Sequence, residues 1–301
     1  LLTQIVATLM AENLVTLQEV AHDGVRVRAS AGSGSPDAIG ARLEECLEAA
    51  QVRVEGLAQE REHPDPGVTH RERAARERVA QVRGARVEEA LRQLPEVQAV
   101  KERQKRHAGK KRAVEVIEAR VSTTDPDARV MKMPGGDFRP AYNVQFATDV
   151  DSQVMVGVEV INRGTDQGEG LVMEEQVAQR TGQHPGAYLL DGGFVDLKDI
   201  EALEGRGVRV YAPPKKREKG QKVTRKPGAK PGVIAWRERM ETEEGQAIYR
   251  HRASTAECVN AQFRVKYGVQ RFTMRGGTNV TCIALLLAVT HTLLRWAALP
   301  G

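Results

Sequence analysis

The sequence is poor in cysteine, with three in 301 residues. Cys46, Cys258 and Cys282 are odd in number and far apart, which excludes a zinc-type cluster and favours a reducing compartment. A basic leader with an apolar core is also missing, so we expect a cytoplasmic protein. The longest apolar run, residues 281–296, contains threonines and His291. It is too short for a comfortable membrane span, so we expect a buried closing helix and no membrane partner.

Other absences exclude familiar chemistries. The glycine-rich residues 32–35 are not followed by a Gly-Lys-Ser/Thr signature, which excludes a phosphate-binding loop of that type. A recognisable Ser/His/Asp arrangement is missing as well. The sequence begins with leucine rather than methionine, which leaves open whether an N-terminal part is missing.

Positive charge is concentrated in one segment. The net charge is +5, but residues 211–240 contain ten Lys or Arg and only two Glu. Four prolines interrupt this segment, which predicts a mobile loop rather than a regular helix or central strand. Such a loop suits a polyanion, although a plain solvated loop remains the alternative. The basic residues that we select for phosphate contacts are Lys215, Lys216, Lys222, Arg225 and Lys226.

Hydrophobic periodicity predicts a mixed α/β core. Residues 15–29 alternate as a strand, and residues 39–120 have helical spacing, with breaks expected near residues 63–67 and Pro95. The remaining predicted elements are strands at 142–148 and 153–161, a helix at 169–180, a strand at 187–190, a helix at 196–204, a strand at 208–212 and helices at the C-terminus.

Three carboxylates lie where local elements begin or end: Asp23, Asp191 and Glu257. Asp191 ends an apolar run and precedes two glycines, so it can present its charge at the mouth of a strand. The alternative is that Asp191 only starts a turn, since Asp-Gly is an ordinary turn signal. Alternation should point the neighbouring His22 to the opposite face from Asp23, which indicates a structural role.

Glu257 lies in a helical stretch in which Arg250, Glu257 and Arg264 recur every seven residues, with Asn260 on the same face. Cations beside a carboxylate keep it ionised for metal binding. The competing interpretation is a capping box, in which Ser254 and Glu257 merely satisfy a helix N-terminus.

The chain resembles the DDE transposases of bacterial insertion sequences in four blocks that occur in order: AHDGVRVRASAG, STTDPDARVMK with GGDFRPAYNVQFATD, YLLDGGF and YRHRASTAECVNAQ. The resemblance covers nearly the whole chain and implies a ribonuclease H-like mixed sheet with flanking helices. It also implies that a long, coiled-coil-like helical insertion interrupts this core after the first strand. The expected domains are residues 1–35 and 121–213 for the core, 36–120 for the helical insertion, 214–245 for a basic loop insertion and 246–301 for the closing helices.

The resemblance implies that Asp23, Asp191 and Glu257 are the catalytic, metal-binding acids. The family's helix signature is tyrosine, two residues, arginine, three residues, glutamate, six residues and lysine, to which Tyr249, Arg252, Glu257 and Arg264 correspond. Here four residues separate Arg252 from Glu257, and arginine replaces lysine. Arg250 is therefore a rival for Arg252 on a regular helix. Asp125 and Asp127 compete with Asp23, which we prefer because it precedes the helical segment.

The implied activity is cleavage and joining of element ends by two Mg²⁺ ions, for which Mn²⁺ can substitute. DNA is the expected partner, bound by the basic loop and the helix face, and a homodimer is expected when two ends are paired. Trp236 is expected to be a packed aromatic, with base stacking as the alternative. A different class of function is a truncated or inactive DNA-binding or assembly protein. A nuclease that cuts without strand transfer is a third possibility.

Overall fold

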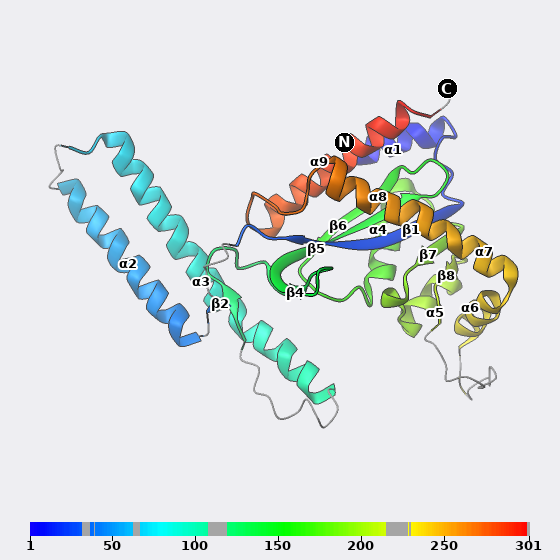
Figure 1. Cartoon of the computed structure of the whole chain (residues 1–301), viewed down its shortest axis with the longest axis horizontal. Helices are drawn as coiled ribbons and strands as arrows, with labels where there is room; N and C mark the ends of the chain where they lie inside the picture. The colour runs from blue at the N-terminus through cyan, green and yellow to red at the C-terminus, as the bar shows by residue number, and fades with distance from the viewer. Residues whose placement is uncertain are drawn as a thin grey trace. The chain divides into compact units, whose positions relative to one another are not determined.

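The computed structural model of the chain describes residues 1–31, 37–38, 40–62, 67–107, 119–214, 228 and 230–299. These residues belong to two compact units (Figure 1). The first comprises Leu1–Val27, Tyr142–Arg271 and Gly277–Gly301, and the second comprises Arg28–Ala141 and Phe272–Gly276.

A mixed sheet forms the centre of the first unit. Its strands are β1 (Glu19–Arg28), β5 (Phe138–Asp149), β6 (Met155–Ile161), β7 (Ala187–Leu190) and β8 (Arg209–Tyr211). The order is β5-β1-β7-β8, with β6 paired to β5. Strands β1, β7 and β8 are parallel, whereas β5 and β6 form an antiparallel hairpin. The predicted mixed α/β core is confirmed, and this arrangement is compatible with the ribonuclease H-like fold expected above.

Helices cover the sheet, and most of them follow the predicted order. They are α1 (Leu2–Ala11), α4 (Glu169–Thr181), α5 (Leu197–Gly205), α6 (Pro231–Glu241), α7 (Glu243–Arg252), α8 (Cys258–Ala261) and α9 (Gly277–Trp296). Helices α4 and α9 both contact β6, which explains why four successive residues of that strand, Met155 to Val158, are buried. A tighter turn, η1 (Gly192–Phe194), follows β7.

The expectation of a loop throughout residues 211–240 is wrong at its C-terminal end, because Pro231–Glu241 form α6. Proline lacks the N–H that a first helical turn leaves unpaired anyway, so Pro231 starts this helix without a penalty. Val233, Trp236 and Met240 then recur on the buried face. Trp236 is packed as expected, 1% exposed, with its Nε1 donating to the Ala212 carbonyl at 3.0 Å.

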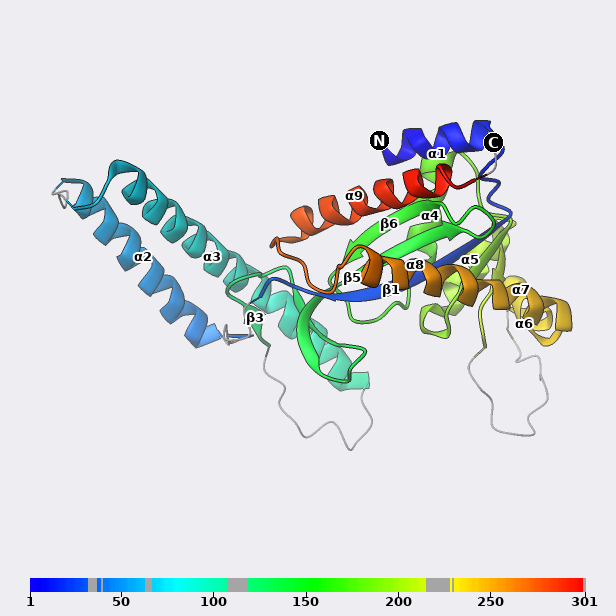
Figure 2. The ribbon, with the colours of Figure 1, turned by 45° about the horizontal axis from the view of Figure 1, so that its top comes forward.

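Helix α9 is buried on one face only. Val280, Ala284, Ala288 and His291 are buried, whereas Leu286 is 61% exposed. Figure 2 shows α9 beside α1 and β6, and it contacts both. Among the described residues, α9 is the one helix with the length and apolar composition of a membrane span. The packing of one face of α9 on the sheet agrees with the closing helix predicted above, although the helix is less buried than expected.

The second unit contains the predicted helices as α2 (Gly40–Glu62) and α3 (His70–His107), with the short strands β2 (Asp37–Ala38), β3 (Val121–Ser122) and β4 (Arg129–Lys132). Strand β4 pairs with the start of β5. The break expected at Pro95 is wrong, because α3 continues through it. Leu94 and Val97 pack on the cluster of Leu43, Val87, Ala90 and Val121, so burial on both sides of Pro95 offsets the lost hydrogen bond.

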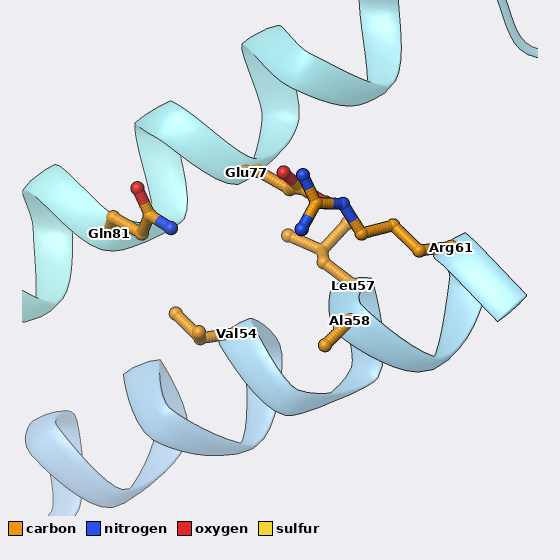
Figure 3. A pocket seen from close by; sticks show the side chains of 6 residues that line it. All are labelled: Val54, Leu57, Ala58, Arg61, Glu77 and Gln81. Atoms are coloured by element: carbon orange, nitrogen blue, oxygen red, sulfur yellow. The ribbon is translucent and has the colours of Figure 1, made fainter. Parts of the chain in front are cut away.

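A small cavity of about 60 Å³ opens between α2 and α3 (Figure 3). The side chains that line it are Val54, Leu57, Ala58, Arg61, Glu77 and Gln81. Two of these residues, Arg61 and Glu77, form an ion pair of 2.9 Å. The cavity is part of the packing of the helical pair, and its lining contains none of the carboxylates singled out in the sequence.

Candidate active site

The parallel pairing of β1 with β7 places the first two candidate acids next to each other. The register pairs Glu19 with Ala187 and continues to His22 with Leu190. The next positions along the two strands are Asp23 and Asp191. Paired residues of neighbouring strands point to the same face of a sheet, so these two carboxylates leave the sheet together.

Asp191 combines the two roles that its sequence left open. It directly follows β7 and is exposed, as expected for a charge at the mouth of a strand. It also starts the turn η1, because its Oδ1 accepts a hydrogen bond from the Gly192 amide at 2.6 Å. The turn uses only one carboxylate oxygen, so the second remains available to a ligand.

Both carboxylate oxygens of Asp23 have polar partners. Its side chain is 21% exposed and lies 3.3 Å from Nη1 of Arg252, measured at Oδ2. Oδ2 also accepts a hydrogen bond from Nδ2 of Asn260 at 3.0 Å, and Oδ1 accepts one from the Gly24 amide at 2.9 Å. Burial raises the pKa of Asp23, the Arg252 charge and the Gly24 amide oppose this shift, and the charges of Asp191 and Asp166 add to it.

Arg252 connects the strand acids with Glu257. Its Nη2 lies 3.9 Å from Oε1 of Glu257, and its side chain is 12% exposed. Burial by itself lowers the pKa of Arg252, but the carboxylates of Asp23 and Asp191 and a hydrogen bond with Tyr249 outweigh burial and raise it. Figure 1 shows α7, which ends at Arg252, and α8, which begins after Glu257, running across β1.

A π-helical turn decides between Arg250 and Arg252. Residues Ala253–Glu257 form η2, a turn that contains one residue more than an α-helical turn. Five residues of a π-turn therefore return to the same face as four residues of an α-helix, so Arg252 and Glu257 face one another. Arg250 is exposed instead. A second π-turn, η3 (Gln262–Lys266), follows α8 and packs on the sheet through Phe263, whose ring lies 4.9 Å from that of Phe146.

The capping-box interpretation of Glu257 is wrong. The helix begins at Glu243, where Thr242 caps it by accepting from the Gly245 amide at 3.0 Å. The backbone runs helically through Ser254 and Glu257, and the Ser254 hydroxyl donates to the His251 carbonyl at 2.9 Å. Glu257 therefore has no helix N-terminus to satisfy, and its side chain is 67% exposed.

The remaining candidates have different positions. Arg264 lies half-buried on η3, three residues beyond Ala261, the last residue of α8. Asp125 and Asp127 lie in the second unit, where Asp125 accepts from the Gly276 amide and Asp127 from Gln93. Five predicted phosphate contacts lie outside the described residues: Lys215, Lys216, Lys222, Arg225 and Lys226.

Asp166 is a carboxylate that the sequence analysis missed. It lies between β6 and α4, where Asp-Gln-Gly resembles an ordinary turn. Its Oδ1 accepts from Nδ2 of Asn143 at 2.6 Å and from Nε2 of Gln145 at 2.8 Å. Asn143 and Gln145 are buried polar residues of β5 with a spacing of two, which places them on one face of the strand. Two polar residues with a spacing of two in a buried strand were the signal that could have revealed the site.

The oxygen donors of this region suit Mg²⁺ in kind, because carboxylates and water are its preferred ligands. In the described part of the chain, however, no three His, Cys, Asp or Glu side chains are gathered closely enough to hold a metal ion. The Arg252 guanidinium lies instead between Asp23 and Glu257. Asp23, Asp191, Glu257 and Asp166 could hold a cation after side-chain movement, with Arg252 leaving Asp23.

One known protein family matches a segment that contains part of this candidate site. Residues 213–297 match a family described as Transposase DDE domain. The match supports the assignment of this chain to the DDE transposases. DNA is the partner of that family, and divalent metal ions are its general cofactor. The match covers less than a third of the chain and includes Arg252, Glu257 and Asn260, whereas Asp23 and Asp191 precede it. No curated protein and no solved structure gives a significant match.

Proposed function

We propose that this DDE transposase cuts and joins the ends of a bacterial insertion element, with Asp23, Asp191 and Glu257 as its metal-binding acids. One observation carries the proposal. Arg252 lies within 3.9 Å of both Asp23, on β1, and Glu257, inside the matched segment. Asp191 is next to Asp23 through the strand pairing. Acids from three distant parts of the chain thus approach one place, as two-metal phosphodiester chemistry requires.

The cofactor of the proposal is a pair of Mg²⁺ ions, with Mn²⁺ as a substitute, which would activate water and stabilise the leaving oxygen. The residues have separate tasks. Asp23, Asp191 and Glu257 hold the cations, and Asn260 orients Asp23 by donating to its Oδ2. Tyr249, Arg252 and Arg264 hold DNA phosphates beside them. Arg252 would be available for this contact if a cation were held at Asp23.

The basic segment before α6 completes the DNA contacts. The sequence supplies Lys215, Lys216, Lys222, Arg225 and Lys226 there, and their contacts with phosphate would make DNA affinity fall with salt. Pairing of two element ends requires two active sites, so we propose a homodimer that acts in the cytoplasm on nucleoid DNA. The helical second unit is our candidate for mediating that pairing.

The proposal is tested with Asp191→Ala and a plasmid that carries the DNA flanking the gene for this chain. The wild-type protein is expected to nick this plasmid with Mg²⁺ or Mn²⁺ and to join the cut 3′ ends to a target. Asp191→Ala is expected to bind the DNA and leave it uncut. Equal cleavage by wild type and variant refutes the site. Wild-type protein that retards DNA without cutting it identifies a binding or assembly protein, and cutting without joining identifies a nuclease.

A further inference from the structure

Asp166 is held by a buried polar network that crosses three strands. The Tyr188 hydroxyl on β7 and Nδ1 of His22 on β1 are 2.9 Å apart, as are Nε2 of His22 and Oε1 of Gln145 on β5. Gln145 in turn donates from Nε2 to Oδ1 of Asp166 at 2.8 Å. Desolvation by burial lowers the pKa of His22 to about 3, so this histidine is neutral. One tautomer then satisfies every link: Tyr188 donates to Nδ1, and Nε2–H donates to Gln145.

The network packs closely against Gly24, the residue after Asp23 on β1. A Cβ atom added to Gly24 would lie 2.5 Å from Nε2 of Gln145 and 2.8 Å from Oδ1 of Asp166. Oδ1 of Asn143 would also be 2.8 Å away. Only glycine leaves room for these side chains, so the residue after Asp23 brings the Asp166 carboxylate close to the candidate site.

The second oxygen of Asp166 and one oxygen of Asp191 both lie near Gly193. The position that a Cβ on Gly193 would take lies 3.7 Å from Oδ2 of Asp166 and 3.8 Å from Oδ2 of Asp191. Two carboxylate oxygens therefore lie within 3.8 Å of one position beside Gly193, and each belongs to a side chain whose other oxygen accepts from amide donors. Like charges in such a space repel one another unless a cation or its bound water lies between them.

An unsatisfied acceptor lies beside Gly24 in the network that holds Asp166. Asn143 is 1% exposed, and within the described residues its buried Oδ1 has no hydrogen-bond partner. Its Nδ2 donates to Asp166, and its Oδ1 lies beside Gly24. Buried polar atoms are nearly always paired, so this oxygen indicates a missing donor such as a bound water molecule.

We infer that Asp166 is a fourth carboxylate of the metal site, which binds through Oδ2 the hydrated cation held by Asp191. The inference rests on the proposed function. Mg²⁺ usually keeps several waters and takes one or two carboxylates, so two facing oxygens that share its hydration shell suit it well. The amides of Asn143 and Gln145 fix the carboxylate, and Gly193 keeps the space between Asp166 and Asp191 open.

The test measures binding of Mn²⁺ to the full chain, without DNA, by electron paramagnetic resonance. Asp166→Asn keeps an oxygen for the two amide donors and removes the charge, so it preserves the network. We expect it to weaken Mn²⁺ binding about 10-fold to 100-fold, the range found when groups around a metal are removed. Asp151→Asn is the matched control, because Asp151 is exposed on the β5–β6 turn, and it is expected to bind Mn²⁺ like wild type.

A second variant serves if Asp166→Asn does not fold, as judged by urea unfolding in EDTA. Gly193→Ala adds a methyl group at ordinary contact distance from both oxygens, so it is expected to fold normally and still to weaken Mn²⁺ binding. Gly205→Ala, which adds a methyl group in open space, is its control. Loss of binding in Asp191→Asn, with wild-type binding in Asp166→Asn and Gly193→Ala, overturns this inference alone. Wild-type binding in Asp191→Asn as well overturns the proposed metal site.

Discussion

The interaction of Arg252 with Asp23 allows a quantitative prediction for the metal-free protein. Arg252→Met keeps most of the aliphatic side chain and removes the guanidinium, which lies 3.3 Å from Asp23 in a region where the two side chains are 12% and 21% exposed. With an effective dielectric constant of about 20, the attraction at this separation is about 5 kcal/mol. Desolvation of both groups offsets much of this gain, so we expect the variant to lose about 1–3 kcal/mol of unfolding free energy.

The assay is urea unfolding in EDTA near neutral pH, with Arg250→Met as the matched control. Arg250 is two residues away on the same helix and is exposed, so its replacement is expected to change the unfolding free energy by less than about 0.5 kcal/mol. Adding Mg²⁺ is expected to stabilise Arg252→Met at least as much as wild type, because a cation then supplies the missing charge. Equal stability of the two variants in EDTA would refute the reasoning.

Three further predictions concern the stability of the fold. Gly24→Ala forces a methyl group against Asp166, Gln145 and Asn143 and is expected to reduce the unfolding free energy by about 1–3 kcal/mol. Gly205→Ala adds its methyl group in open space, so its unfolding free energy should stay close to that of wild type in the same thermal and urea unfolding measurements. Burial lowers the pKa of His291, so the folded protein binds fewer protons than the unfolded chain. Its unfolding free energy should therefore decrease as pH falls below about 6.5, by at most about 1.4 kcal/mol per pH unit. His291→Gln should show a shallower decrease between pH 7 and 5.5, and an unchanged slope would contradict the lowered pKa of His291. Deletion of Ser254 is expected to convert the π-turn into a regular α-helical turn that keeps Arg252 opposite Glu257, so the melting temperature should stay near that of wild type. As a control, deletion of the exposed Val172 from the regular helix α4 should clearly lower the melting temperature.

Most of the core could be predicted because its signals are local. Strands β7 and β8 lie in short, mainly apolar runs bounded by turn residues, and α4 and α5 repeat their apolar residues at helical spacing. Proline caused the two clear errors. Its meaning depends on position, since Pro231 begins a helix and Pro95 lies within one that packing stabilises on both sides.

The candidate site was only partly visible in the sequence. Asp23, Asp191 and Glu257 have local signals, but the choice of Arg252 over Arg250 depends on a π-turn, which leaves no mark in composition or periodicity. Asp166 depends on amides that come from a strand about twenty residues earlier in the chain. Such contacts are fixed by tertiary packing, so a window of neighbouring residues cannot contain them.

The site also has to fold before any cation is bound, and its contacts indicate how it does so. Asp23 is half-buried near two other carboxylates, which raises its pKa and opposes its ionised form. Arg252, Asn260 and the Gly24 amide offset this cost by supplying one positive charge and two hydrogen bonds. Arg252 and a divalent cation therefore compete for Asp23. A weaker Arg252 pair should reduce the stability of the metal-free protein and tighten its metal binding, since the same carboxylate provides both.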